Sequence, residues 1–227
     1  MNIFPIGAAQ AANSQGSMNS VTTWPFFEPN LRCSSNKIYT VLTSRFENQT
    51  LQSRKKAEPY LMINYEYENI FAREFHQIET FIDLVEEGLN SFYVVDFSRG
   101  QTPTGVTDSS GDWVVAIDFT NYYSTTANQK ATRAFLTDGI NWKEGPVDSM
   151  SANTSITVDV DGSNYGSLLL ATANTSAVVF PLYEVYLVPN SMSDFKAGTF
   201  VGGKMTLTKD GGFIRSGSIS FTTKYKV

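Results

Sequence analysis

The chain has 227 residues, of which 13% are aromatic, and its 17 basic and 22 acidic side chains give a net charge of −5. A single Cys (Cys33) and a single His (His76) are too few for a structural zinc site or an internal disulfide. The only basic run is Arg54-Lys55-Lys56, so we expect no specific nucleic-acid binding. Sparse charge with many aromatic and β-branched residues predicts a mainly β protein.

Residues 1–31 are predicted to form an extended N-terminal arm. They have no periodicity, and two closely spaced prolines exclude a helix around Trp24, Phe26 and Phe27. These three aromatic side chains need a surface to cover them. They pack either on their own domain or, in the sharper interpretation, on a neighbouring subunit. The segment lacks an early positive charge and a long apolar run, so neither a signal peptide nor membrane insertion is expected.

Two strands are predicted on either side of a polar excursion. Residues 37–43 are β-branched and aromatic, and residues 61–67 alternate between large apolar and more polar side chains, as in a half-buried strand. The polar stretch between them, residues 44–59, is too long for a tight hairpin.

A flanking amphipathic helix is predicted at about residues 69–87. One apolar stripe with helical spacing comprises Phe71, Phe75, Ile78, Ile82 and Val85. Asn69 is a reasonable N-cap, and Gly88 stands where a left-handed residue ends a helix. His76 lies beside the stripe and is interpreted as a boundary or solvent residue. A strand at 91–97 follows the helix.

The remaining chain predicts a loop and a series of short strands. Residues 98–112 are rich in Gly, Ser, Thr and Pro and are expected to be a long loop. Pro181 restricts its strand to a sheet edge or a bulge, and Asp161-Gly162 predicts a hairpin turn. The expected strands are Trp113–Phe119, Ser155–Val160, Ser167–Thr172, Ala177–Val188, Lys204–Thr208 and Ser218–Lys226.

Two segments around the predicted helix form a combined pattern. Phe46-Glu-Asn-Gln-Thr-Leu-Gln-Ser-Arg54 lies between the first two strands, and Glu87-Gly-Leu-Asn-Ser-Phe-Tyr-Val-Val-Asp96 follows the helix. The pattern resembles the minor-tail and distal-tail proteins of long-tailed bacteriophages, including the lambda minor tail protein M group. It covers residues 37–97 and, more weakly, the closing strands at 200–226. Gln49 replaces the family's turn Gly and Ser53 separates Gln52 from Arg54, so no contact of these residues is carried over.

The resemblance implies a β-sandwich or barrel-like tail-ring domain over residues 32–227, with 98–176 as a possible loop-rich β insertion. It implies a virion structural protein, assembled in the host cytoplasm, whose homo-oligomeric ring joins the tail tube to distal tail or baseplate components. The expected partners are further copies, the tail tube, the tape measure and other hub proteins. It implies no enzymatic activity, no cofactor and no catalytic or metal-binding residue. Candidate intersubunit contacts are Trp24, Phe26, Phe27, Arg99, Thr102 and Thr104.

Other functions remain open from the sequence. A head–tail connector or tail-completion ring is a close alternative. A carbohydrate-binding β-sandwich would stack Trp24, Trp113 or Trp142 on sugar rings. A glycosidase would need two carboxylates about 5–10 Å apart, and the Asp and Glu residues show no recognisable pairing.

Overall fold

The computed structural model of the protein describes residues 2–4, 7–8, 32–39, 41–45, 51–55, 60–85, 89–109, 112–126, 130–138, 142–159, 164–165, 177–191, 196–197, 200–201, 204–205 and 214–224. Across these residues the fold is mainly β, so the predicted class is confirmed. The main strands form one open 14-stranded sheet rather than two separate sheets of a sandwich. The predicted strand 167–172 and the turn at 161–162 lie outside the described residues.

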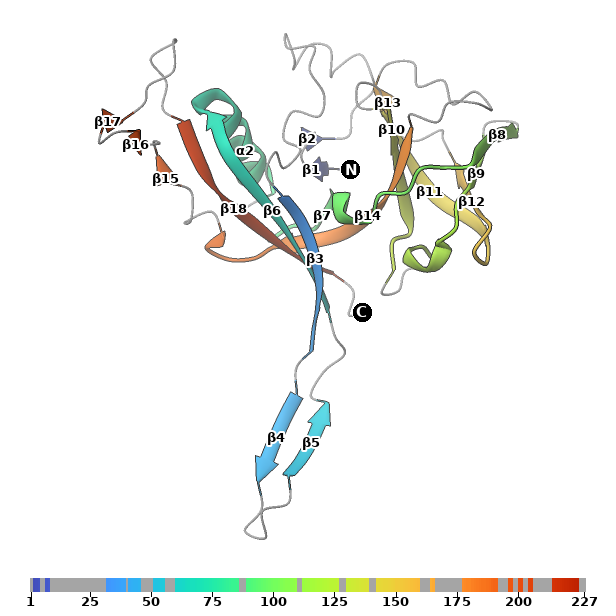
Figure 1. The fold of residues 1–227 in the computed structure, drawn as a ribbon, viewed down its shortest axis with the longest axis horizontal. Helices are drawn as coiled ribbons and strands as arrows, with labels where there is room; N and C mark the ends of the chain where they lie inside the picture. The colour runs from blue at the N-terminus through green and yellow to red at the C-terminus, as the bar shows by residue number, and fades with distance from the viewer. Residues whose placement is uncertain are drawn as a thin grey trace.

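Strand β14 (Val178–Leu187) joins the two parts of this sheet, because it pairs with three other strands. Its first half pairs with β10 (Arg133–Thr137), and its second half pairs with β7 (Phe92–Val95) and β18 (Ile214–Thr223). The sheet therefore extends from β14 into two lobes, which lie to the left and right in Figure 1.

The helix lobe contains the long antiparallel strands of the sheet. Strand β6 (Tyr60–Phe71) pairs with β18 on one side and with β3 (Arg32–Ile38) on the other. The predicted alternation is present in β6, where Leu61, Ile63, Tyr65 and Tyr67 are buried. The other strands of this lobe are β1 (Asn2–Phe4), β2 (Gly7–Ala8) and β15 (Lys196–Ala197), with β16 (Phe200–Val201) and β17 (Lys204–Met205) forming a separate pair.

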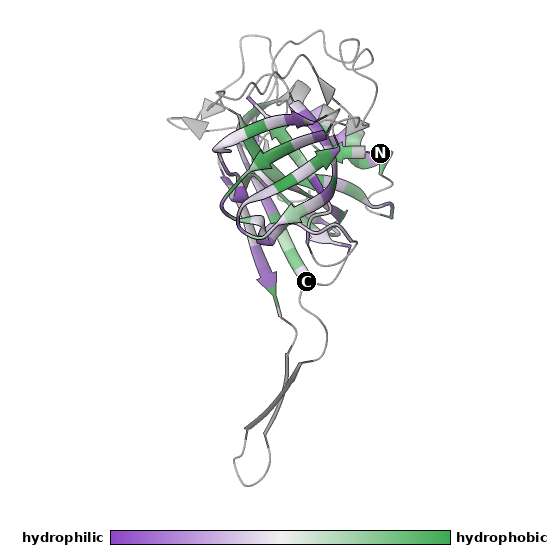
Figure 2. Ribbon diagram, turned by 90° about the vertical axis from the view of Figure 1, so that its right-hand side faces the viewer, coloured by the Kyte–Doolittle hydropathy of each residue, from purple (hydrophilic) through white to green (hydrophobic). Residues whose placement is uncertain are grey.

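The strand lobe continues from β10 through a run of antiparallel strands. In order across the sheet these are β11 (Trp142–Ser151), β12 (Ser155–Asp159), β9 (Asp112–Ala116) and β8 (Gly105–Ser109), with β13 (Asn164–Tyr165) pairing β11. Hydrophobic residues are spread along these strands in Figure 2. Strands β10 and β11 have no counterpart in the sequence prediction. The predicted loop at 98–112 is wrong in part, because it contains β8 and most of the short helix η2 (Phe97–Arg99).

The helix α2 (Ala72–Leu84) is shorter than the predicted 69–87 and starts later. The prediction of Asn69 as an N-cap is wrong, because β6 continues through Phe71, which pairs with Ile214 of β18. Within α2, Phe75, Ile78, Phe81 and Ile82 are buried, as is Val85 just after it. The Phe81 ring lies 5.2 Å from the Phe92 ring of β7, so the apolar stripe packs against the sheet.

The first residues of the predicted N-terminal arm belong to the core. Strand β1 pairs in parallel with β7, and Ile3 and Phe4 are completely buried. The Phe4 ring lies 5.1 Å from Phe81 and 5.3 Å from Phe221. An arm starting at residue 1 is therefore wrong for residues 2–4, because burying two large apolar side chains stabilises their docking. Residues 9–31, including Trp24, Phe26 and Phe27, lie outside the described residues.

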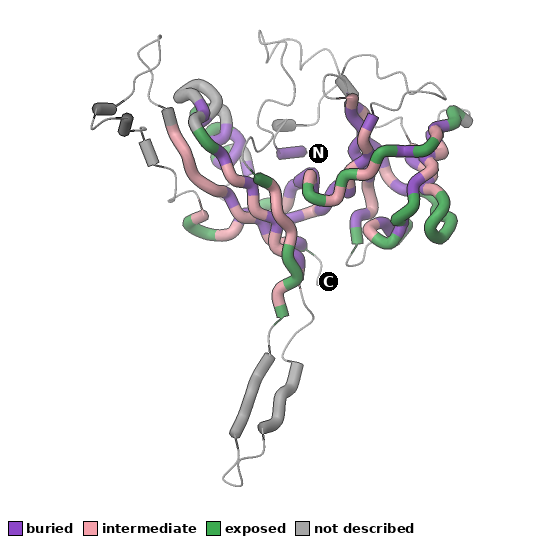
Figure 3. Tube along the Cα trace, viewed as in Figure 1, coloured by how far each residue is buried: buried purple, intermediate pink, exposed green. Residues whose placement is uncertain are grey.

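The central strands are buried on both faces. One face of β7 and β14 contacts the α2 core, and the other contributes Val95 and Leu182 to a second cluster with Ile3, Phe135 and Trp142. Figure 3 shows buried residues along these strands, whereas exposed residues follow the connections of the strand lobe. Burial on both faces explains why β14 reads as a nearly continuous apolar run.

The prediction that Pro181 lies at a sheet edge is wrong, because its strand, β14, lies in the middle of the sheet between β7 and β10. Opposite Pro181, the Asp96 N–H donates to the Pro181 carbonyl at 3.0 Å. In a regular ladder the Asp96 carbonyl would accept from residue 181, but it accepts from the Arg99 N–H at 3.1 Å, where η2 begins. Proline, which has no N–H to donate, is tolerated at this position because the Asp96 carbonyl already accepts its hydrogen bond from Arg99.

Candidate functional site

Arg99, a predicted intersubunit contact, lies at the junction of the two lobes. Its Nε is 3.3 Å from Asp96 Oδ2, and its Nη1 donates to the Tyr183 hydroxyl at 2.9 Å. Its guanidinium carbon lies 4.9 Å from the centre of the Tyr122 ring. Only 19% of the side chain is exposed, so most of Arg99 is engaged within its own chain.

The carboxylate of Asp96 organises this junction from a fully buried position. Its Oδ1 accepts hydrogen bonds from the Ser98 backbone N–H at 3.1 Å and from the Ser98 hydroxyl at 2.5 Å. These bonds cap η2 and turn the chain so that Arg99 reaches Oδ2. A buried carboxylate needs such partners, because an unpaired charge in the interior is costly.

Three ionisable side chains around Asp96, one cysteine and two tyrosines, hold their protons more tightly than usual. Burial raises the pKa of Tyr183 to about 12, although the Arg99 cation acts in the opposite direction. Burial, followed by the negative charge of Asp96, raises the pKa of Cys33 to about 12, and burial raises the pKa of Tyr123 well above its ordinary value. At neutral pH the Cys33 thiol therefore remains protonated, which is unfavourable for nucleophilic attack.

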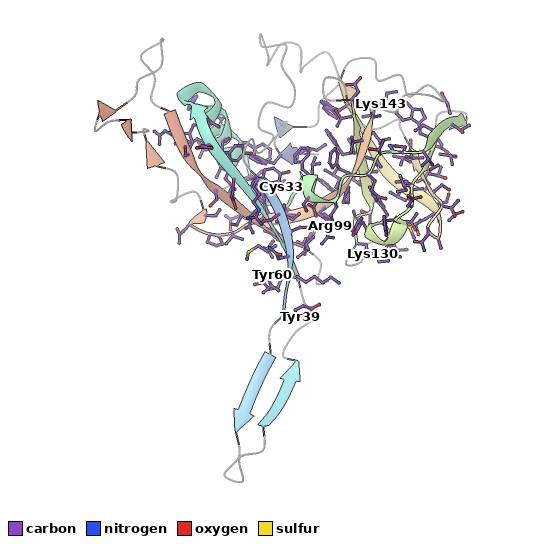
Figure 4. The ribbon with its side chains drawn as sticks, in the orientation of Figure 1. Cys33, Tyr39, Tyr60, Arg99, Lys130 and Lys143 are labelled. Atoms are coloured by element: carbon purple, nitrogen blue, oxygen red, sulfur yellow. The ribbon has the colours of Figure 1, made fainter. Side chains whose placement is uncertain are left out.

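The same junction connects three elements that are distant in sequence. Cys33 is on β3 and its Sγ lies 3.9 Å from Asp96 Oδ1, while the Ser35 and Ser98 hydroxyls are 2.9 Å apart. Figure 4 shows Cys33 and Arg99 near each other at the centre of the molecule. We therefore interpret this network as the connection that holds the base of β3 and the two lobes together.

The other two described intersubunit candidates, Thr102 and Thr104, are exposed on the strand lobe. The neighbouring Gln101 fixes this surface, because its amide donates to the Phe119 carbonyl at 2.9 Å and accepts from the Phe119 N–H at 3.0 Å. Phe119 itself is 60% exposed. The exposed residues Thr102, Thr104 and Phe119 therefore lie on two segments that this pair of hydrogen bonds joins.

The sequence prediction missed a projecting hairpin within the polar excursion. Strands β4 (Val41–Arg45) and β5 (Leu51–Lys55) pair antiparallel from Val41 with Lys55 to Arg45 with Leu51. They form a two-stranded sheet of their own, and Figure 1 places them well away from the two lobes. Tyr39 and Tyr60 lie at the base of the hairpin in Figure 4, and Tyr39 is 63% exposed.

An isolated two-stranded hairpin is at best marginally stable in water. Both outer edges of this one lack a strand partner among the described residues. Tyrosine at such a base is typical of protein interfaces, because it adds apolar area and a hydroxyl at a low entropic cost. Among the residues that the structure describes, the hairpin with its base is therefore the strongest candidate interaction surface. The sequence offers little signal for this hairpin, because residues 51–55 read Leu-Gln-Ser-Arg-Lys and do not alternate between apolar and polar side chains.

The two tryptophans that the structure describes offer little surface for stacking on sugars. Trp142 is completely buried, and Trp113 is 6% exposed with the Lys143 ammonium 4.5 Å from its ring centre. Trp24 lies outside the described residues. His76 is exposed on α2, as the sequence predicts for a boundary or solvent residue, and its Nδ1 lies 3.7 Å from Glu79 Oε2.

Within the part of the chain that the structure describes, no group of three or more His, Cys, Asp or Glu side chains could hold a metal ion. Nor is any helix in that part long and apolar enough to cross a membrane. No protein-family model matches the chain, and no curated protein sequence matches it.

Proposed function

We propose that this protein is a structural subunit of a phage tail, forming a ring that joins the tail tube to distal tail or baseplate components. The observation that carries the proposal is the hairpin β4–β5, which extends from the helix lobe as a separate two-stranded sheet. An assembly subunit needs surfaces that reach its neighbours, whereas a monomer gains nothing from an exposed marginal hairpin.

The place of the hairpin in the chain also supports the proposal. It lies in the segment 37–97, whose pattern resembles phage minor-tail and distal-tail proteins, together with β6, α2 and β7. A closed ring requires heterologous contacts, in which one surface of a subunit meets a different surface of the next. The hairpin and the exposed surface of Thr102, Thr104 and Phe119 are two such different surfaces.

The proposed partners are further copies of the chain in a ring, with the tail tube, the tape measure and other hub proteins above and below it. The virion is the proposed location, after assembly in the host cytoplasm. The arrangement at Asp96 and Arg99 supports a mechanical role, because it stiffens the junction from which β3 leads to the hairpin.

The test is to purify the full-length chain and measure its mass distribution by mass photometry, with negative-stain images of the same sample. We expect particles of one uniform mass that is a multiple of 25.1 kDa, with rotational symmetry in class averages. Antibody labelling of virions that carry the protein should mark the tail. A chain that stays monomeric at all concentrations, or labelling of the capsid alone, would contradict the proposal.

A further inference from the structure

The projecting hairpin carries a charge opposite to that of the rest of the molecule. Strands β4 and β5 contain three basic residues, Arg45, Arg54 and Lys55, and no acidic one, which gives the hairpin strands a net charge of +3. The remaining chain has 14 basic and 22 acidic residues, a net charge of −8. The opposite signs favour contact between the positive hairpin of one copy and the negative body of a second copy.

The negative charge of the body is concentrated around α2. Residues 66–87 contain seven acidic side chains and one basic one, Arg73, so this segment has a net charge of −6. Glu79 and Asp83 are exposed on α2, while the opposite side of α2 packs on the sheet through Phe75, Ile78 and Ile82. We refer to the exposed side of α2, with Glu79 and Asp83 about one helical turn apart, as the acidic helix face.

The hairpin and α2 lie at opposite ends of the helix lobe in Figure 1. The hairpin of a given copy therefore extends away from its own acidic helix face. A second copy placed at the end of the hairpin can present that face to it. Such a contact joins two different surfaces, so it is heterologous and can be repeated around a ring.

We propose that the hairpin β4–β5 of one copy docks on the acidic helix face of a second copy of this chain. The contact supplies the marginal hairpin with a partner, and the charges on the two sides are complementary. Tyr39, exposed at the hairpin base, adds apolar area to the same contact. This inference rests on the proposed ring function and names the surfaces through which its subunits meet.

Reversing one charge on the hairpin tests the proposal. Arg54→Glu should weaken self-association of the full-length chain by about tenfold or more in sedimentation velocity, since it places a negative charge against the acidic helix face. Lys130→Glu is the matched control, because it makes the same change of charge at an exposed position of the strand lobe and should shift the association constant less than about twofold. Circular dichroism should show the same fold for both variants.

A compensating change identifies the receiving surface. Asp83→Lys alone should weaken association as Arg54→Glu does. In the double variant Arg54→Glu, Asp83→Lys, the carboxylate introduced on the hairpin of one copy can meet the ammonium introduced on the helix of the next copy. The same pairing can form in an equal mixture of the two single variants. We therefore expect the double variant to regain most of the lost affinity, as coupled pairs do in a double-mutant cycle. Absence of any recovery would overturn the acidic helix face as the docking surface.

Two further outcomes separate this inference from its foundation. Closed rings that persist unchanged in Arg54→Glu and in Lys55→Glu would remove the docking inference and leave the ring function standing, whereas a wild-type chain that never associates would remove both. If the wild-type chain retards duplex DNA in a gel and Arg54→Glu abolishes this without changing self-association, the hairpin is a nucleic-acid element and the inference is wrong.

Discussion

Truncation of Phe4 to alanine tests whether the start of the chain is part of the body or an arm. Phe4 is completely buried in β1, and its ring lies 5.8, 5.1 and 5.3 Å from the rings of Tyr65, Phe81 and Phe221. Loss of a buried Phe side chain generally costs about 3–5 kcal/mol. Strand β1 has only three residues and can shift to close part of the cavity, so we expect a loss of about 3 kcal/mol.

Urea denaturation followed by circular dichroism measures this loss. The slope of the free energy of unfolding against urea should stay constant while the midpoint falls, which is the signature of a change in stability alone. Phe119→Ala is the control, because Phe119 is 60% exposed and its truncation should cost less than about 0.5 kcal/mol. A loss below about 1 kcal/mol for Phe4→Ala would refute the docking of β1 in the core.

Four other outcomes follow from the structure. Gly145→Ala should lower the unfolding free energy by about 3 kcal/mol, because a Cβ there would lie 1.6 Å from the Asp159 carbonyl oxygen, while Gly105→Ala, which meets nothing within 4 Å, should be nearly neutral in the same urea titration. Arg99→Ala should cost about 3 kcal/mol in thermal or chemical unfolding, since it leaves the buried Asp96 carboxylate without its cation; an unchanged midpoint would mean that the junction is dispensable. The pKa values of Cys33 and Tyr183 rise from 9.0 and 10.0 to about 12 on folding, so the folded state binds these protons more tightly. The free energy of unfolding should therefore stay constant below about pH 9 and fall as the pH rises towards 12. Because Cys33→Ser removes one of these two groups, the free energy of unfolding of this variant should fall less steeply just above pH 9 when urea denaturation is measured at a series of pH values. Deletion of residues 9–31, which keeps β1, should leave the circular dichroism of the body unchanged and abolish ring formation in mass photometry if the aromatic segment is an intersubunit arm; unfolding would place Trp24, Phe26 and Phe27 in the core, and normal rings would show the arm to be dispensable.

Elements whose residues contact the core with a regular period could be predicted from the sequence. The spacing of Phe75, Ile78, Ile82 and Val85 matches the helical repeat, and the alternation from Leu61 to Tyr67 matches the strand repeat. Both patterns are local, because the side chains that face one surface recur at the period of the backbone. The mainly β class followed from composition, because sparse charge with many aromatic and β-branched residues favours strands.

The boundaries and the partners of these elements depended on pairing between distant residues. Strand β6 runs past Asn69 to Phe71 because β18, near the other end of the chain, supplies a partner as far as Ile214. The composition of β11, with Glu144, Gly145 and Pro146 in succession, has low β propensity, and its pairing with β10 and β12 determines its conformation.

The candidate interaction surfaces, too, could be predicted from the sequence only in part. The sequence identified Thr102 and Thr104 within a polar segment and the basic run after residue 53, because polarity and charge are properties of single residues. That Arg99 turns inward to Asp96 and Tyr183, and that residues 41–55 project as a hairpin while residues 2–4 enter the core, was decided only by tertiary structure. Burial depends on which distant segments come together, and no local period of the chain encodes that choice.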